Sequence, residues 1–196
     1  MTIFLSDSLF MLPLLLCSVV AVAVIVHRMV SLRATNVLPQ ALTTALRDAD
    51  AETIRNQVED DRSSLGRVCQ QALTKQHPNR AAATSSAETY AREEISKLQA
   101  GLTTLEVIIT IAPLLGLLGT VSGLVTVFSG LGASGNQAPS GSGIARGIAE
   151  ALNTTIAGLV VAVPAVIAHG FFQRKIERLT TRMERVLHEA IERFYH

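Results

Sequence analysis

The chain has 196 residues, of which 48% are hydrophobic and 17% are charged. This composition is that of a membrane protein with a modest soluble part, and it argues against a chain that is soluble throughout. The formal net charge is +1, and we expect no nucleic-acid partner.

The first apolar run, residues 9–28, is predicted to be a transmembrane helix, because about 20 helical residues cross a bilayer. It ends at His27 and Arg28, and the residues before it include Asp7 but no Lys or Arg. A secretory signal peptide needs a positively charged start and a cleavage site, so we expect a retained anchor. Residues 1–8 are expected to lie in the periplasm.

Residues 29–104 are predicted to form a cytoplasmic helical region of short amphipathic helices. At about 70 residues, this region is small for an independent hydrophobic core. Its last helix is expected to continue without a break into the second span. The residues predicted to cap these helices are Asp50, Ser63 or Ser64, and Ser85 or Ser86.

Two further spans are predicted, over residues 105–130 and 144–172. The polar loop between them, residues 131–143, is rich in turn-forming residues and is expected to lie in the periplasm. The tail, residues 173–196, is predicted to be a cytoplasmic amphipathic helix. Ten of the 17 Lys and Arg residues lie in the segment from Arg28 to Lys97, six lie in the tail, and the remaining one is Arg146. The positive-inside rule therefore places the N-terminus outside and the C-terminus in the cytoplasm.

Both later spans carry a face of small residues, which lets membrane helices approach closely. Pro164 is also expected to kink the third span. The residues predicted to serve helix packing are Gly116, Gly119, Gly123 and Pro113 in the second span, and Gly147, Gly158 and Pro164 in the third.

A polar path is predicted along these spans, formed by Thr120, Glu150, Thr154 and Thr155. An acid inside an apolar segment costs roughly 2.5 to 3.5 kcal/mol on insertion scales, so Glu150 is expected to be functional and to face a helix interface. Two alternatives remain open: the threonines satisfy their own helix backbone, and Glu150 only holds subunits together through hydrogen bonds.

The chain is predicted not to be an enzyme, and no cofactor or metal is expected. Its five histidines show no metal-ligand spacing. The glycines of GLLGTVSG are not followed by the Lys-Ser/Thr of a phosphate-binding loop. An enzyme within the cytoplasmic region is a weak alternative.

Two segments, APLLGLLGTVSGLVTVF (Ala112 to Phe128) and GIAEALNTTIAGLVVAVPA (Gly147 to Ala165), resemble the MotA/TolQ/ExbB proton channel family. The three-span layout is similar to that of ExbB and TolQ. The resemblance implies an all-α, polytopic protein of the bacterial inner membrane with three transmembrane helices and long cytoplasmic helix extensions. It further implies a homopentameric ring around an ExbD- or TolR-like single-span protein with a membrane Asp, with protons as the coupling ion.

The resemblance also implies roles for individual residues. Thr120 and Thr155 match the pore threonines of the family, and Glu150 matches its third-span glutamate. The implied function is an ExbB-like subunit of a proton-driven motor that acts on a TonB-like transducer for outer-membrane transport. The alternatives are a TolQ-like subunit, which serves envelope integrity and acts on a TolA-like transducer, and a helical membrane scaffold that conducts no ions.

Overall fold

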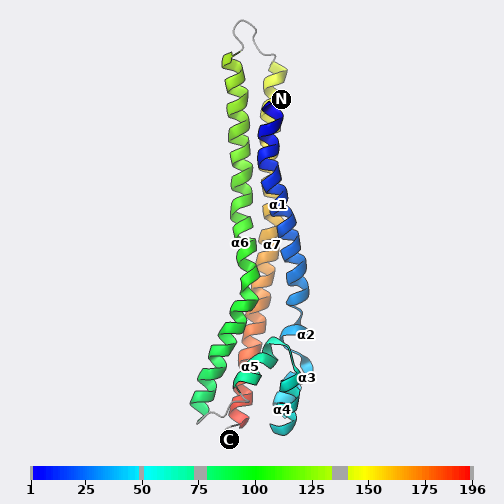
Figure 1. Ribbon diagram of the computed structural model, residues 1–196, viewed down its shortest axis with the longest axis vertical. Helices are drawn as coiled ribbons and strands as arrows, with labels where there is room; N and C mark the ends of the chain where they lie inside the picture. The colour runs from blue at the N-terminus through cyan, green and yellow to red at the C-terminus, as the bar shows by residue number, and fades with distance from the viewer. Residues whose placement is uncertain (1, 49–50, 73–78, 134–140, 195–196) are drawn as a thin grey trace. The chain divides into compact units, whose positions relative to one another are not determined.

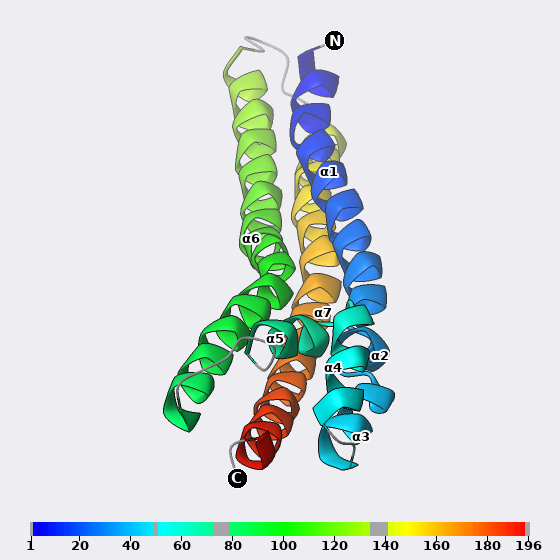
Figure 2. The same cartoon turned by 60° about the horizontal axis from the view of Figure 1, so that its bottom comes forward.

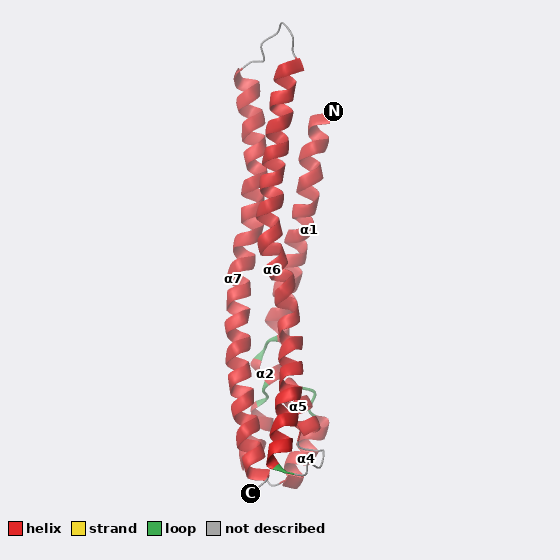
Figure 3. Cartoon of the chain, turned by 90° about the vertical axis from the view of Figure 1, so that its left-hand side faces the viewer, coloured by secondary structure: helices red, strands yellow, loops and turns green. Residues whose placement is uncertain are grey.

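The computed structural model describes residues 2–48, 51–72, 79–133 and 141–194. In these ranges every regular element is a helix and no strand occurs, which confirms the predicted all-α class (Figure 3). The helices are α1 (Thr2–Ser31), α2 (Ala34–Val37), α3 (Gln40–Asp48), α4 (Ala51–Asp60), α5 (Ser64–Ala72), α6 (Arg80–Ala133) and α7 (Gly141–Phe194).

Three helices are long and apolar enough to cross a membrane, namely α1, α6 and α7. This confirms the predicted number of spans. Helices α6 and α7 contain 54 residues each, so each is about 80 Å long at 1.5 Å per residue. The hydrocarbon core of a bilayer is about 30 Å thick. Each of the two helices therefore extends well beyond its membrane-spanning part.

The chain divides into two compact units, and α6 and α7 contribute to both. The first, here called the span unit, comprises Met1–Val26 and Thr103–Gly170. The second, here called the polar unit, comprises His27–Leu102 and Phe171–His196.

In the span unit, α1, α6 and α7 lie side by side (Figures 1 and 3). Its interior is built mainly from small side chains, such as Ala112, Ala151 and Ala165, each at most 1% exposed. Large apolar side chains point outward instead. On α7 these include Leu152, Ile156, Leu159, Val160 and Val163. Such a surface is stable only against lipid or another apolar protein surface.

The polar unit gathers α2 to α5 beside segments of α6 and α7 (Figure 2). Its core contains larger side chains, including the fully buried Leu65, Phe172 and Met183. The unit is thus organised like a small water-soluble domain, with apolar residues inside and charges outside. A further buried cluster links α5, α6 and α7 through Ala72, Ala83, Ala87 and Ile191.

Helix α5 begins where the sequence predicts, because the backbone N–H of Gly66 donates to Ser63 Oγ at 3.0 Å. This bond satisfies one of the free N–H groups in the first turn. The prediction that α6 begins near Ser85 or Ser86 is wrong. The helix begins at Arg80, and the N–H of Ala82 donates to Asn79 Oδ1 at 2.8 Å. Asn caps as well as Ser does, and the alanines that follow favour helix.

The boundaries of the predicted loop also differ from the structure. Helix α6 continues to Ala133 and α7 starts at Gly141, so part of 131–143 is helical. Similarly, α1 already begins at Thr2, within the segment expected to precede the first span. The predicted cap Asp50 lies outside the described residues. The assignment of segments to periplasm and cytoplasm stays a prediction.

Candidate functional site

The candidate site lies in the span unit, where α6 and α7 come into backbone contact at two glycines. A Cβ added to Gly158 would lie 2.5 Å from the carbonyl oxygen of Ala112 and 3.2 Å from the Cα of Gly116. A Cβ added to Gly116 would lie 2.8 Å from the carbonyl oxygen of Thr154. No side chain fits at either position, so the two helices approach as closely as small residues in membranes allow.

The other predicted packing glycines line the same contact. A Cβ on Gly119 would lie 2.8 Å from Thr154 Oγ1, and one on Gly123 would lie 2.9 Å from the Cβ of Ala151. A Cβ on Gly147 would lie 2.5 Å from a methyl of Val127. The two predicted prolines lie within the same two helices. Pro113 is half-buried in α6, Pro164 is exposed on α7, and both helices continue through them.

Three threonine hydroxyls meet at this close approach. Thr120 Oγ1 lies 2.5 Å from Thr155 Oγ1 and 3.2 Å from Thr154 Oγ1. Thr120 is 7% exposed and Thr154 is 2% exposed, so both hydroxyls are shielded from the medium around the unit. The structure therefore brings together three of the four residues predicted to form a polar path.

Two backbone carbonyls complete this threonine cluster. Thr120 Oγ1 lies 2.8 Å from the carbonyl oxygen of Ala151 on the opposite helix and 3.2 Å from that of Gly116 on its own helix. Thr154 Oγ1 lies 2.7 and 3.1 Å from the same two oxygens, and Thr155 Oγ1 lies 3.3 Å from that of Gly116. The threonines thus bond across the helix pair as well as to their own backbone.

The cluster has more acceptors than protons. Each hydroxyl has one proton to donate and two lone pairs to accept with, so the three hydroxyls can donate only three hydrogen bonds at once. One order that uses short contacts has Thr155 donating to Thr120, Thr120 to the carbonyl of Ala151, and Thr154 to the carbonyl of Gly116. Other orders use the remaining contacts. The cluster is therefore an uncharged hydrogen-bond chain whose direction can reverse.

Glu150 lies apart from this cluster. Its carboxylate accepts from Arg146 Nε at 2.9 Å, one turn earlier on α7, and its side chain is 43% exposed. None of the hydrogen bonds described for the structure joins it to the threonines. Glu150 is linked to the threonines by the backbone: the next residue is Ala151, whose carbonyl accepts a hydrogen bond from Thr120. The Arg146 guanidinium gives this acid a partner within the single chain.

The Arg146–Glu150 pair is part of a longer polar face of α7. At about 100° per residue, Arg146, Glu150 and Asn153 fall in one sector, between the glycine face that meets α6 and the face of large apolar residues. The same sector continues with Ala157, Pro164 and Ala168, and the whole sector is half-buried or exposed. This polar sector thus carries charge and an amide first and small residues afterwards, with none of the leucines or isoleucines of the neighbouring face.

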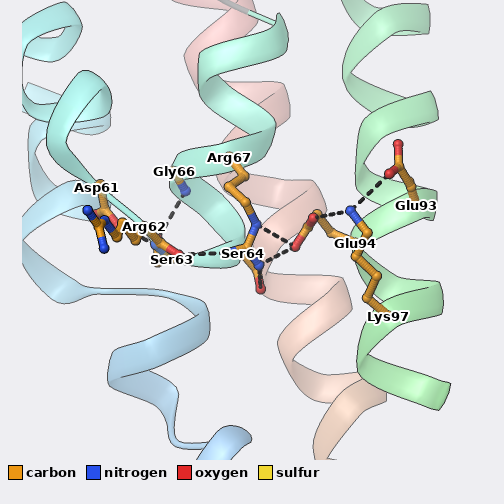
Figure 4. Close-up of polar contacts among 9 residues, drawn as sticks. All are labelled: Asp61, Arg62, Ser63, Ser64, Gly66, Arg67, Glu93, Glu94 and Lys97. Carbon is orange, nitrogen blue, oxygen red and sulfur yellow. Dashed lines mark hydrogen bonds and ion pairs between the residues drawn. The ribbon is translucent and has the colours of Figure 1, made fainter.

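A second polar cluster, in the polar unit, was not predicted from the sequence. Glu94 of α6 is 4% exposed and accepts from Arg67 of α5 at 2.5 and 3.0 Å (Figure 4). Lys97 donates to the other carboxylate oxygen at 3.0 Å and also pairs with Glu93 at 2.9 Å. The sequence does hold a signal: Glu94 stands at helical spacing from the buried Ala87, Ala91 and Leu98, on the apolar face of its helix.

The surroundings of Glu94 favour its ionised form. Burial by itself raises the pKa of this carboxyl, but hydrogen bonds and charge from Arg67 and Lys97 outweigh burial, and the net pKa lies below the ordinary value of 4.5. Glu94 is therefore a structural anion that fastens α5 to α6. In the same unit burial raises the pKa of the Cys69 thiol to about 12, so this cysteine is not a nucleophile at neutral pH.

Metal ligands do not gather in the described ranges: no group of three or more His, Cys, Asp or Glu side chains has a metal-binding arrangement there.

Comparison with known proteins assigns the chain to a family. The sequence profile of the MotA/TolQ/ExbB proton channel family matches residues 34–185, a stretch that includes the threonine cluster, Glu150 and most of the polar unit. The chain belongs to this family. Like other members of the MotA/TolQ/ExbB family, it is a multi-pass membrane protein built on apolar helices.

Several relatives carry the name ExbB. A Synechocystis protein named ExbB-like 1 is 34% identical over 171 residues, which cover 84% of this chain and 66% of the relative. The biopolymer transport protein exbB1 of Vibrio cholerae is 38% identical over 103 residues, which cover 52% of this chain and 44% of the relative. ExbB of Xanthomonas campestris is 37% identical over 101 residues, 52% of this chain and 39% of the relative. The chain therefore spans about two fifths to two thirds of the length of these relatives.

Proposed function

We propose that the chain is an ExbB-type subunit of a proton-driven motor in the bacterial inner membrane. The observation that carries this proposal is the threonine cluster, in which Thr120 and Thr155 lie 2.5 Å apart in the interior of the span unit. Helix packing alone is already provided by the glycines around it. A buried chain of reversible hydroxyl donors and acceptors is, in addition, what a proton path through an apolar medium needs.

The polar sector of α7 supports assembly with other chains. An exposed ion pair and an exposed amide are costly against lipid, so this sector requires a protein surface or a water-filled space beside it. Its small residues, such as Ala157 and Ala168, allow a further helix to approach. We infer that a homopentamer, together with an ExbD- or TolR-like single-span protein with a membrane Asp, provides that surface.

The mechanism follows from the chemistry of these groups. The threonine hydroxyls do not titrate near neutral pH, so they can orient and pass hydrogen bonds but cannot store a proton. A titratable carboxyl must therefore hold the proton, and the membrane Asp of the partner has that role in the proposal. Glu150 lies on the polar sector and pairs with Arg146, so its carboxyl stands beside the path.

In this arrangement the proton gradient drives rotation of the ring relative to the partner. Force is passed to a TonB-like transducer for outer-membrane transport. The N-terminus lies in the periplasm and the C-terminus in the cytoplasm, so that the basic polar unit stays on the cytoplasmic side. The name that several relatives share, biopolymer transport protein ExbB, supports this task over envelope maintenance.

The test uses the full chain expressed with its native partners, in cells where transport depends on it. Thr120→Val and Thr155→Val remove hydroxyls of the cluster while keeping side-chain volume, and Glu150→Gln replaces the carboxyl of the sector with an amide. We expect gradient-driven uptake to fall by about tenfold or more for each variant, since removal of one such interaction from a working site costs this order of rate. Membrane insertion and assembly are expected to persist.

Thr126→Val is the matched control. Thr126 also lies on α6, but its hydroxyl donates to the carbonyl of Ser122 on its own helix at 3.0 Å, so its loss leaves the cluster intact. Full uptake by Thr120→Val and Thr155→Val would show that the path is assigned wrongly. Loss of assembly by Glu150→Gln, with normal uptake per remaining complex, would favour the scaffold.

Native mass spectrometry of the complex, gently extracted from its host, tests the partners. Five copies of this chain with a single-span protein that has a membrane Asp are expected. A homo-oligomer that never retains such a protein would contradict the motor proposal. A TolA-like third component would show that the motor serves envelope integrity instead of outer-membrane transport.

A further inference from the structure

A cavity of about 320 Å³ lies in the polar unit, between α3 and the part of α7 that belongs to this unit. Small-molecule sites in proteins start at about this size. Its charged lining consists of three arginines, Arg47, Arg182 and Arg185, and one acid, Glu189. The apolar part of the wall is formed by Leu38, Leu46 and Val186.

The positive charge of this cavity is not balanced by the protein. Arg47 and Glu189 form an ion pair at 3.3 Å, so the single acid of the lining already has a cation. The carbonyl of Arg47 also accepts a hydrogen bond from Arg193, which holds α3 against α7. Arg182 and Arg185 make no side-chain hydrogen bond or ion pair with any residue that the structure describes. Two arginines of the lining are therefore left without an ion-pair partner among the described residues.

The two arginines are placed to act together. They are three residues apart on α7, so their side chains share one face of the helix. Gln40 and Thr44 of α3 add an amide and a hydroxyl to the lining. Planar guanidinium groups bind phosphate oxygens through paired, charge-assisted hydrogen bonds. An apolar wall beside such donors suits the organic part of an ester.

We propose that this cavity binds a small phosphate-bearing anion. The site is independent of the proton path, because it lies in the other unit and uses none of the same residues. The phosphate could belong to a soluble compound or to a lipid headgroup. Among the described side chains, Phe171 is the last large apolar residue of α7 that is exposed, and Arg182 follows it by about 16 Å of helix at 1.5 Å per residue. This separation favours a soluble anion over a lipid.

The experiment measures binding of inorganic pyrophosphate to the full chain in phosphatidylcholine nanodiscs by isothermal titration calorimetry, at constant ionic strength. We expect saturable binding at one site per chain. The double variant Arg182→Gln/Arg185→Gln is expected to bind about tenfold more weakly or not at all. Arg182→Gln alone is expected to have a smaller effect in the same direction.

Arg174→Gln is the matched control, because Arg174 is an exposed arginine of α7 that does not line the cavity. It removes one positive charge, as Arg182→Gln alone does, and is expected to bind pyrophosphate as the wild type does. Circular dichroism of each variant shows whether it is folded. Absence of saturable binding by the wild type, or equal weakening in Arg174→Gln and the double variant, would overturn the proposal.

A second arm identifies the source of the phosphate. Nanodiscs that contain phosphatidylglycerol are compared with those of phosphatidylcholine alone. If pyrophosphate binding is unchanged, the ligand is a soluble anion, as expected. If phosphatidylglycerol competes, and its retention in native mass spectra depends on Arg182 and Arg185, the phosphate chemistry is right and a lipid headgroup supplies it.

Discussion

Helices α6 and α7 are held together differently in the two units. In the span unit they meet through glycines and alanines, and their polar contacts are uncharged hydroxyls and carbonyls. In the polar unit the same helices are packed with large apolar residues such as Phe172 and Met183, and exposed charged pairs such as Arg47–Glu189 lie around the core.

The difference follows from the medium. In water, burial of large apolar side chains is the main driving force, and charged groups stay partly solvated at the rim. In lipid, burying apolar surface between helices gains little free energy. Close backbone packing and hydrogen-bonded polar groups are therefore the main interactions that hold the helices together. One pair of helices thus obeys two sets of packing rules along its length.

The largest effect is expected from filling the glycine contact of the span unit. Gly158→Val places side-chain atoms on the backbone of Ala112, where even a Cβ would lie 2.5 Å from the carbonyl oxygen. Overpacking against backbone has little room to relax, so we expect a loss of about 3 kcal/mol in the free energy of unfolding. Unfolding in mixed detergent micelles, followed by circular dichroism, measures it.

Gly170→Val is its control, because a Cβ at that position would meet no described atom within 4 Å apart from the adjacent backbone of its own helix. It adds the same apolar volume to the same helix. Similar stability losses for both variants would show that the close contact of α6 and α7 is not what Gly158 provides.

The next largest effect is expected from the ion pair of the polar unit. Glu94→Gln removes the charge that Arg67 and Lys97 surround and leaves a buried, imperfectly paired site. We expect a loss of about 2 kcal/mol in the free energy of unfolding. Glu93→Gln is the comparison, because Glu93 is exposed and its pairing with Lys97 should contribute little.

The pH dependence of the stability of the polar unit tests whether the ionised Glu94 carboxylate stabilises the fold. Because the pKa of Glu94 is lower in the folded chain than its ordinary value of 4.5, the ionised carboxylate stabilises the fold. This stabilisation is present in full above pH 4.5 and is lost as the pH falls through the lowered pKa. Acid titrations of the wild type and Glu94→Gln should therefore converge at low pH. Parallel curves would contradict the assignment.

A smaller effect is expected at Gly101, a glycine of the polar unit that, like those of the span unit, leaves no room for a Cβ. The Arg28 side chain is 8% exposed, and a Cβ on Gly101 would lie 2.0 Å from its Nε. Since the guanidinium can shift, Gly101→Ala should cost only about 1 kcal/mol of unfolding free energy. Combining it with Arg28→Ala should cost less than the sum of the two changes, and strict additivity would exclude the contact.

The smallest effect on stability is expected in the threonine cluster. Interhelical hydrogen bonds in membranes contribute about 0.6 kcal/mol on average, so Thr120→Val should lower the free energy of unfolding by about that amount. The same micelle assay measures it, with Thr126→Val for comparison. A loss comparable to that of Gly158→Val would mean that the threonines mainly hold the helices together.

The fold was predictable where a single residue type or a long apolar run decides the outcome. The three spans follow from uninterrupted apolar length, and the start of α5 follows from Ser63 as its cap. The start of α6 was predicted too late, because Asn79 and Ser85 are both good caps and local propensity does not choose between them. In the candidate site, residue types were predictable, but the pairing of Thr120 with Thr155 depends on the rotation of two helices.

The sequence by itself determined the all-α class, the number of membrane-spanning helices, the membership of the MotA/TolQ/ExbB family and the residue types available for a polar path. Each of these depends on composition, length and local spacing. Tertiary structure decided that Thr120, Thr154 and Thr155 share hydrogen bonds while Glu150 pairs with Arg146, and that Glu94 is buried between Arg67 and Lys97. These pairings depend on how distant helices are rotated against one another, and that rotation is set by the sum of many packing contacts rather than by any one segment.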